Sequence, residues 1–353
     1  VQDQWARIGV EGLKYDFVVR PGGRVSDIRM RYSGATSVAI GDDGMLIAET
    51  PLGSIREHAP VVYQDVAGSS AVSARRTVRA RYALQDNVLR FDVGAFDAAL
   101  PLTIDPFVEW STYCGGRNSE YATATAIDGA GNILTAGWTN SDDFPATAGA
   151  WQRILSGKED AFVAKFAPDG SPLWITYYGG REKDLALGIA ARANGDIAVC
   201  GYTLSTDFPV SVNAFQPAQA GIGDAFLLRF AADGTLQWST FLGGSDEDEA
   251  CSVTFDSQGD FVLTGRTISA NFPRSFGCLQ FNRAGSFDAF IGKFRADGTR
   301  AWLTFYGGAL EEWGHSVATD AQDNIVVSGH TFSTDFPVSA NAFQKAYTGS
   351  GTE

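Results

Sequence analysis

Four carboxylates recur at one fixed spacing in this 353-residue chain, and they are its clearest candidates for chemistry. Each stands four residues after a Gly-Gly pair and 64 residues from the next member: Glu120, Asp184, Asp248 and Glu312. Ca²⁺ prefers oxygen ligands and takes about six to eight of them, so a ring of such acids could gather Ca²⁺ or another hard cation. The alternative is structural, because a carboxylate beside a tight turn can accept hydrogen bonds from the backbone N–H groups of that turn.

A second set of residues holds one repeat position but varies in type. Each member follows a glycine of the repeat, and the set is Trp138, Tyr202, Arg266 and His330. Constant flanks around a large, varied residue predict a binding surface for a protein or glycan at one end of the repeats. The alternative is a rim position without any constraint.

The sequence predicts no catalytic residues. It contains no Gly-x-Ser-x-Gly nucleophile elbow and no phosphate-binding loop. The three histidines are too few and too scattered along the chain to indicate a metal site or a catalytic base: His58, His315 and His330. An enzyme remains the alternative, as a hydrolase or lyase that works in a channel mouth with Asp184 or Asp248 as base.

The 64-residue spacing extends to many other positions, which predicts stacked copies of one structural unit with a continuous core. It separates the tryptophans at 110, 174, 238 and 302 and the Asp/Asn-Phe-Pro tripeptides at 143, 207, 271 and 335. Within one copy, residues 123–128, 132–139, 160–166 and 174–178 read as strands, and Asp169-Gly170 reads as a hairpin turn. Four antiparallel strands per repeat predict a β-propeller blade, with the first strand nearest the central channel.

The acids or amides before each Phe-Pro suggest how the loops are held. Asn271 replaces Asp in one copy, so hydrogen-bond acceptance matters more than charge at this position. We expect these residues, together with the in-register threonines and serines just before them, to brace the loop.

The repeat motifs resemble a known family. Trp-x-Thr-Tyr/Phe-x-Gly-Gly, Gly-x-Thr-x-Ser-x-Asp-Phe-Pro and Asp-Ala-Phe-x-x-Lys/Arg-Phe resemble the bacterial SBBP-type β-propeller repeat over about residues 108–353. Tyr15–Gly22, Ile28–Tyr32 and Pro101–Pro106 resemble the β-rich domain that commonly precedes such repeats. The resemblance implies an extracellular or cell-surface bacterial protein, and a non-enzymatic module for adhesion or for interaction with a protein or glycan. It carries over no active-site residues, and a structural spacer in a large surface protein is the other interpretation.

We therefore expect an all-β chain with two parts: an antiparallel β domain at 1–107, incomplete at its start, and a β-propeller at 108–353. The propeller divides into a lone strand at 108–116, blades at 121–180, 185–244 and 249–308, and a partial blade at 313–353. Because propellers usually close with about 4–8 blades, this count favours a fragment of a larger ring. The alternative is that Trp110–Gly116 completes a fourth blade with residues 313–353.

Charge and composition exclude several classes of partner. Residues 1–105 hold 12 Lys and Arg against 13 Asp and Glu, whereas the remainder holds 15 against 28. Acidic repeats repel phosphate backbones, so nucleic acid is not expected as a partner. The sequence contains no stretch of about 18 apolar residues, so it predicts no membrane-spanning helix.

The four cysteines form no Cys-x-x-Cys, which argues against a zinc site: Cys114, Cys200, Cys251 and Cys278. We expect buried free thiols. A Cys200–Cys251 disulfide in an oxidising compartment is the alternative.

Overall fold

The computed structural model describes residues 4–9, 12–41, 44–50, 53–66, 74–105 and 112–348. It divides into two units, Val1–Ser111 and Thr112–Glu353. Within the described residues, the only helical element is a 3₁₀ turn, η1 (Val25–Asp27), and all other regular structure is β-strand. The predicted all-β fold is confirmed.

Unit 1 is an antiparallel β domain. Its strands are β1 (Gln4–Gly9), β2 (Gly12–Val19), β3 (Ser37–Ile40), β4 (Leu46–Thr50), β5 (Gly53–Glu57), β6 (Val61–Val66), β7 (Ala74–Val78), β8 (Ala80–Gln85), β9 (Val88–Val93) and β10 (Leu102–Asp105). They form a five-stranded sheet in the order β1-β2-β10-β6-β7, a three-stranded sheet β3-β4-β5 and the hairpin β8-β9. One buried cluster joins them, with Phe17, Leu46, Val62 and Leu89 among its members.

The alternation of apolar and polar residues at 28–32 predicts a further strand in unit 1. The structure instead has a single bridge there, between Met30 and Leu89. The reason is a turn on either side. The 3₁₀ turn ends at Asp27, and the N–H of Ala35 bonds back to the carbonyl of Tyr32. A segment this short cannot form a continuous ladder.

Unit 2 repeats one four-stranded antiparallel sheet three times and then half of it. Blade 1 holds β11 (Glu120–Ile127), β12 (Ile133–Thr139), β13 (Asp160–Phe166) and β14 (Pro172–Tyr178); blade 2 holds β15 (Asp184–Ala191), β16 (Ile197–Thr203), β17 (Asp224–Phe230) and β18 (Leu236–Leu242); blade 3 holds β19 (Asp248–Phe255), β20 (Phe261–Thr267), β21 (Asp288–Phe294) and β22 (Arg300–Tyr306); the final hairpin holds β23 (Glu312–Thr319) and β24 (Ile325–Thr331). The strands follow the predicted repeat closely. The predicted lone strand at 108–116 is not seen, because residues 112–116 form no strand and 108–111 lie outside the described residues.

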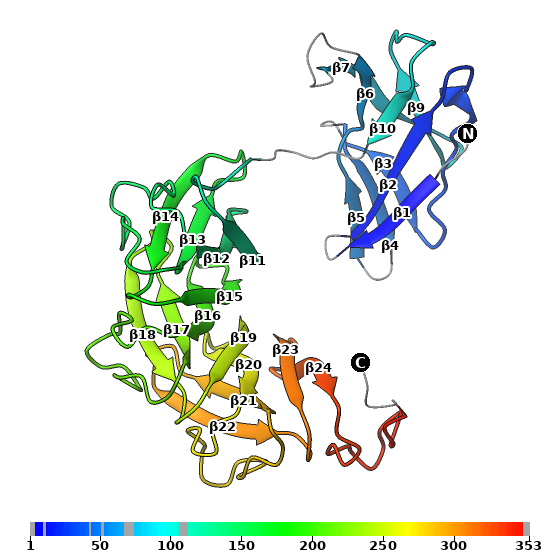
Figure 1. The fold of residues 1–353 in the computed structure, drawn as a ribbon. Helices are drawn as coiled ribbons and strands as arrows, with labels where there is room; N and C mark the ends of the chain where they lie inside the picture. The colour runs from blue at the N-terminus through cyan, green and yellow to red at the C-terminus, as the bar shows by residue number, and fades with distance from the viewer. Residues whose placement is uncertain are drawn as a thin grey trace. The chain divides into compact units, whose positions relative to one another are not determined.

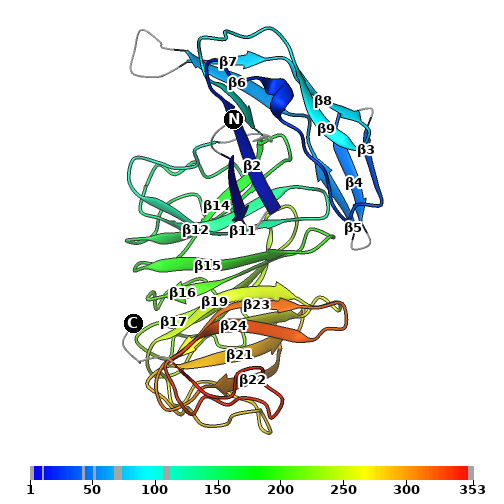
Figure 2. The same cartoon turned by 90° about the vertical axis from the view of Figure 1, so that its right-hand side faces the viewer.

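The blades of unit 2 lie face to face in a curved array. Figure 1 shows the first strands β11, β15, β19 and β23 along its inner side and the fourth strands β14, β18 and β22 along its outer side, and Figure 2 shows the first strands in succession. A short parallel bridge joins each blade to the next, as between Glu159 and Lys183. The inner position of the first strand agrees with a propeller.

The core of unit 2 lies between the blades. Leu134 and Trp174 of blade 1 pack against Phe226 and Phe230 of blade 2, and a second cluster joins blades 2 and 3 in the same way. Burying each such side chain contributes about 1.5–3 kcal/mol, so neighbouring blades stabilise one another. A blade alone would leave these faces in water.

Candidate functional site

The in-register carboxylates begin the first strand of every sheet in unit 2, and each is tied to the turn before it. Asp184 accepts the N–H of Gly180 at 2.7 Å and the hydroxyl of Ser205 at 2.9 Å, and the hydroxyl of Thr203 also donates to it. The bond from the glycine N–H recurs at 3.2, 2.6 and 2.9 Å in the other three members, Glu120, Asp248 and Glu312. Each of these acids therefore accepts a backbone N–H bond from its adjacent turn, as the structural alternative expects.

The structure does not bring the four acids together, because each lies in a different sheet. Asp184 and Asp248 have no exposed surface, and Glu312 is almost as deeply buried. Among the described residues, no group of three or more His, Cys, Asp and Glu side chains could hold a metal ion. The described residues therefore provide no cluster of Ca²⁺ ligands. Asp184 and Asp248, the bases of the enzyme alternative, are buried below the surface.

Burial raises the pKa of the two aspartates in this set. Desolvation raises the pKa of Asp184 to about 7, although its hydrogen bonds act in the opposite direction, and the pKa of Asp248 is raised to about 7 for the same reason. Desolvation also raises the pKa of Asp160, the acid that begins β13, to about 6. A Cβ atom on Gly179 would lie 2.7 Å from Oδ2 of Asp184 and 2.9 Å from Oδ1 of Asp160. The glycine therefore lets these carboxyl groups from neighbouring blades approach.

The residues before each Phe-Pro brace the same turn, as predicted. Oδ1 of Asp207 accepts the N–H of Arg181 at 3.0 Å, and in the copy that carries an amide, Oδ1 of Asn271 accepts the N–H of Ser245 at 2.8 Å. The equivalent bonds are 2.8 Å at Asp143 and 3.0 Å at Asp335. Acceptance by oxygen, which Asp and Asn share, is confirmed as the function of this position.

A glutamine that the sequence interpretation missed completes the three Gly-Gly turns that follow β14, β18 and β22. Nε2 of Gln152 donates to Oδ2 of Asp160 at 2.6 Å, while its Oε1 accepts the N–H of Gly179 at 3.0 Å. The same bond to the third-strand acid is 2.6 Å in blade 2 and 2.9 Å in blade 3. The signal was available, because Gln152, Gln216 and Gln280 stand at one repeat position.

The four varied residues lie at one equivalent place in the array. Each is half-buried near the end of a second strand, directly across from the second residue of the first strand. The cross-strand pairs, which we call the rim row, are Tyr121–Trp138, Leu185–Tyr202, Glu249–Arg266 and Trp313–His330. The scaffold therefore presents four pairs of unlike chemistry in identical settings.

Contacts along the rim row differ from pair to pair. The rings of Tyr121 and Trp138 stack with centroids 4.3 Å apart, and Tyr121 is 56% exposed. Arg266 pairs with Glu249 at 2.7 Å, and its guanidinium lies 3.8 Å from the ring centre of Trp313 in the next sheet. Aromatic rings and arginine are the residue types that most often dominate binding energy at protein interfaces.

The final hairpin brings two of the three histidines together. Nε2 of His315 and Nδ1 of His330 lie 2.8 Å apart. His315 is the extra residue of a β-bulge between Gly314 and Ser316, and a bulge redirects the side chain that it carries. The histidines are scattered in sequence, but the fold brings this pair into contact.

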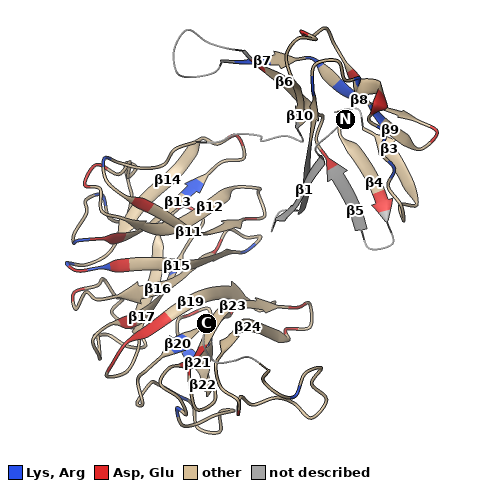
Figure 3. Cartoon of the chain, turned by 45° about the vertical axis from the view of Figure 1, so that its right-hand side comes forward, with Lys and Arg blue, Asp and Glu red and all other residues tan. Residues whose placement is uncertain are grey.

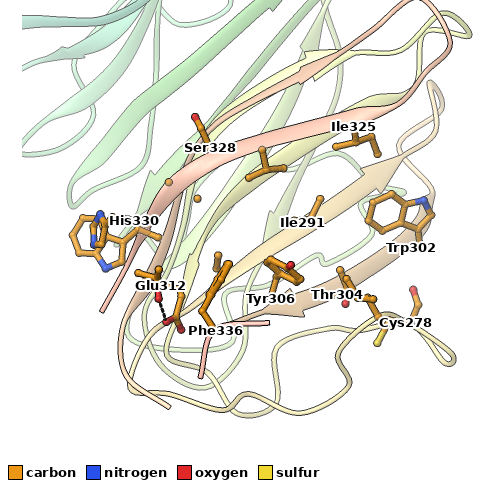
Figure 4. A pocket seen from close by; sticks show the side chains of 18 of the residues that line it. Cys278, Ile291, Trp302, Thr304, Tyr306, Glu312, Ile325, Ser328, His330 and Phe336 are labelled. Atoms are coloured by element: carbon orange, nitrogen blue, oxygen red, sulfur yellow. Dashed lines mark hydrogen bonds between the residues drawn. The ribbon is translucent and has the colours of Figure 1, made fainter. Parts of the chain in front are cut away.

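A groove of about 860 Å³ opens between blade 3 and the final hairpin. Figure 4 shows His330 at one end of the groove and Trp302 at the other. At the preceding junction, the third and fourth strands of blade 3 supply fully buried side chains to the shared core: Phe290, Phe294, Leu303 and Phe305. No such strands follow β24 in the part of the chain that the structure describes, so one edge of β24 stays open.

All four cysteines are free thiols in the structure, which agrees with the thiol interpretation and not with a Cys200–Cys251 disulfide, but only Cys200 is buried and the other three are partly exposed. Cys200 is fully buried, and desolvation raises its thiol pKa well above the usual range. None of the described residues belongs to a helix that is long and apolar enough to cross a bilayer.

Two curated proteins are similar to parts of this chain. One is the "Regulatory protein FlaEY" of Caulobacter vibrioides, 29% identical over 179 residues, which are 50% of this chain and 18% of that protein. The other is the "Uncharacterized WD repeat-containing protein L264" of Acanthamoeba polyphaga mimivirus, 23% identical over 269 residues, which are 65% of this chain and 19% of that protein. The chain thus spans about a fifth of the length of either relative.

Family models match both units. Residues 6–107 match a domain of unknown function, DUF7948, and residues 109–145 match the SBBP family, described as a beta-propeller repeat. The three four-stranded sheets and their 64-residue register continue the pattern of the second match. Residues 109–145 therefore carry an SBBP beta-propeller repeat, and the DUF7948 domain at residues 6–107 comes before it.

Proposed function

We propose that unit 2 is a non-enzymatic protein-interaction module that binds its partner through the rim row. The observation that carries this proposal is the contrast within each sheet. The buried turn, with its acid, glutamine and hydroxyl groups, repeats from blade to blade, whereas the neighbouring rim pair changes its chemistry each time. A constant frame with a varied surface is typical of recognition.

The bracing of the turns supports binding as well as stability. Each Gly-Gly turn is held by a fully or partly buried carboxylate, a hydroxyl and an acceptor oxygen from the following sheet. A rim held in place loses little conformational entropy when a partner arrives, so more of its contact energy appears as affinity. Similarity to a WD-repeat protein and to a regulatory protein agrees with this role, although a fold alone does not specify a partner.

We further propose that the module acts outside the cell or on its surface, in adhesion. The family resemblance supports this location. Figure 3 shows acidic residues at the beginnings of β15 and β19, and this charge disfavours nucleic acid as the partner. A protein partner is favoured over a glycan because the rim row combines stacked rings with an ion pair and extends over several sheets. A spacer without a ligand would not need such variation.

The test compares capture by three forms of the immobilised full chain from a bacterial surface extract: wild type, the Tyr121→Ala/Trp138→Ala variant, and Ile154→Ser as a control. Ile154 is 74% exposed in the loop between β12 and β13, and it belongs to no pair of the rim row. We expect a discrete protein that wild type and the control retain, with affinity lowered about 30-fold or more by loss of the two rings. Capture that is equal in all three forms would refute the rim row as the binding surface, and retention of a glycan alone would replace the protein partner.

A further inference from the structure

We propose that His315 and His330 form a binding site for a divalent transition-metal ion with tetragonal geometry, Cu²⁺ or Ni²⁺. Their facing nitrogens, Nε2 of His315 and Nδ1 of His330, lie 2.8 Å apart. Imidazole is a preferred ligand for these ions, whereas Ca²⁺ prefers oxygen. On binding, the proton of the hydrogen bond moves through solvent to the other nitrogen of its own ring, so that each neutral imidazole presents a lone pair to the ion.

The two nitrogens lie close enough together to bind one ion with tetragonal geometry. Two nitrogens at about 2.0–2.1 Å from one metal lie about 2.9 Å apart when they are adjacent in a square or octahedral arrangement. In a tetrahedral arrangement they would lie about 3.4 Å apart, which is the geometry that Zn²⁺ favours. The observed pair fits the first arrangement. His315 is exposed and the second torsion of histidine is broad, so the rings can turn toward a common ion.

The blade itself does not require this pair. The bulge position that His315 occupies holds Thr123, Leu187 and Cys251 in the other sheets. In blade 1 the hydroxyl of Thr123 donates to the carbonyl of Ala186 at 2.7 Å, which joins two blades. His315 instead meets His330 within its own hairpin. The two imidazoles are therefore specific to this hairpin, and the repeated architecture does not explain them.

The surroundings of the pair suit a bound cation. The ring of Trp313 lies 5.3 Å from that of His330 on one side, and the ring of Phe332 lies 5.2 Å away.

The positive charge of Arg266, on the neighbouring sheet, is already balanced. The guanidinium of Arg266 lies over Trp313, but it is paired with Glu249 at 2.7 Å. Because the two histidines leave further coordination positions free and His315 faces solvent, water completes the shell.

The test uses the tag-free full chain, titrated with NiCl₂ by calorimetry and with CuCl₂ by electron paramagnetic resonance. We expect one saturable site per chain and a Cu²⁺ spectrum with nitrogen ligands. His315→Gln and His330→Gln should each weaken Ni²⁺ binding about tenfold or more, since even the loss of an outer-shell partner costs about 10–100-fold. His58→Gln is the matched control, because His58 is exposed in unit 1, and it should bind as wild type does.

Thermal melts of the three variants separate a lost ligand from a lost fold, since the glutamines keep the size of the side chain. The proposal is overturned if wild type shows no saturable site, or if His315→Gln and His330→Gln bind Ni²⁺ as tightly as wild type. It is also overturned if His58→Gln abolishes binding.

Discussion

The junction between blades 2 and 3 is closed, whereas the junction between blade 3 and the final hairpin is open. The tryptophan at the same repeat position, Trp238 or Trp302, has a different environment at the two junctions. Trp238 is 8% exposed, packs against Gly298 and donates from Nε1 to the carbonyl of Ala296 at 2.9 Å. Trp302, one repeat later, lines the groove instead. The fourth strand of a blade is therefore completed by the turn between the third and fourth strands of the next blade.

The largest expected effect breaks a closed junction at its tryptophan. Trp238→Ala removes a buried ring and its hydrogen bond to Ala296, and we expect a loss of about 3–5 kcal/mol in unfolding free energy. Trp302→Ala should cost less than half as much, since that ring faces the groove. Urea denaturation followed by far-ultraviolet circular dichroism measures both. Equal losses for the two variants would show that the next blade does not anchor the tryptophan.

A buried cation sharpens the same comparison. The side chain of Lys165 is 3% exposed, pairs with Asp128 at 2.9 Å and donates to the carbonyl of Ala232 in the next blade at 3.0 Å. Lys165→Met leaves the Asp128 charge buried without its partner, so we expect a loss of about 3 kcal/mol. Lys293, 23% exposed at the open junction, pairs with Asp256 and Asp260 inside its own blade.

For Lys293→Met we expect a smaller loss, because Lys293 is 23% exposed and water can solvate Asp260, although Asp256 stays buried. The same denaturation assay applies to both lysine variants. If Lys293→Met proves as costly as Lys165→Met, the contact with the following blade contributes little.

The closed junctions should also respond to pH. Burial raises the pKa of Asp184 to about 7, so the folded state binds more protons than the unfolded state between about pH 4 and pH 7. Stability from this group is therefore present at the acidic end of that window and is lost as the pH rises through about 7. A pKa difference of one corresponds to about 1.4 kcal/mol. Melting temperatures at pH 5 and pH 8 should differ less in Asp184→Asn than in wild type, and an unchanged difference would contradict the assignment.

The smallest effect separates the buried bracing from the exposed charge beside it. Arg181 and Asp207 form an ion pair at 3.3 Å with the arginine side chain 86% exposed. We expect Arg181→Ala to cost less than about 0.5 kcal/mol, because the backbone N–H at this position still bonds to Asp207. Asp207→Ala removes that acceptor and should cost about 1 kcal/mol. If thermal melts showed a larger loss for Arg181→Ala than for Asp207→Ala, the ion pair and not the backbone hydrogen bond would hold the turn.

Much of unit 2 could be predicted from its sequence because the repeats serve as aligned copies of one another. Asp160–Phe166 was expected as a strand and is β13, and the replacement of Asp by Asn271 correctly indicated acceptance of a hydrogen bond. Unit 1 has no internal copies, and there a turn on either side reduced the expected strand near Met30 to a single bridge.

The contents of the candidate site were less predictable. His315 and His330 are 15 residues apart in sequence, and only the bulge at His315 and the pairing of β23 with β24 bring their rings together. The Ca²⁺ interpretation of the acids rested on their regular spacing. Regular spacing around a ring separates residues, whereas a metal site needs several ligands at one place.

The bracing of the Gly-Gly turns has a consequence for how such genes lengthen. Gly116, Glu120, Ser141 and Asp143 all belong to one knot of hydrogen bonds, and all of them fall within a single 64-residue window. A duplication or deletion of one whole window therefore copies or removes a complete hydrogen-bond network and leaves no donor or acceptor unpaired. Ring size can change by recombination in steps of one repeat, because each step keeps the hydrogen bonds of every turn complete.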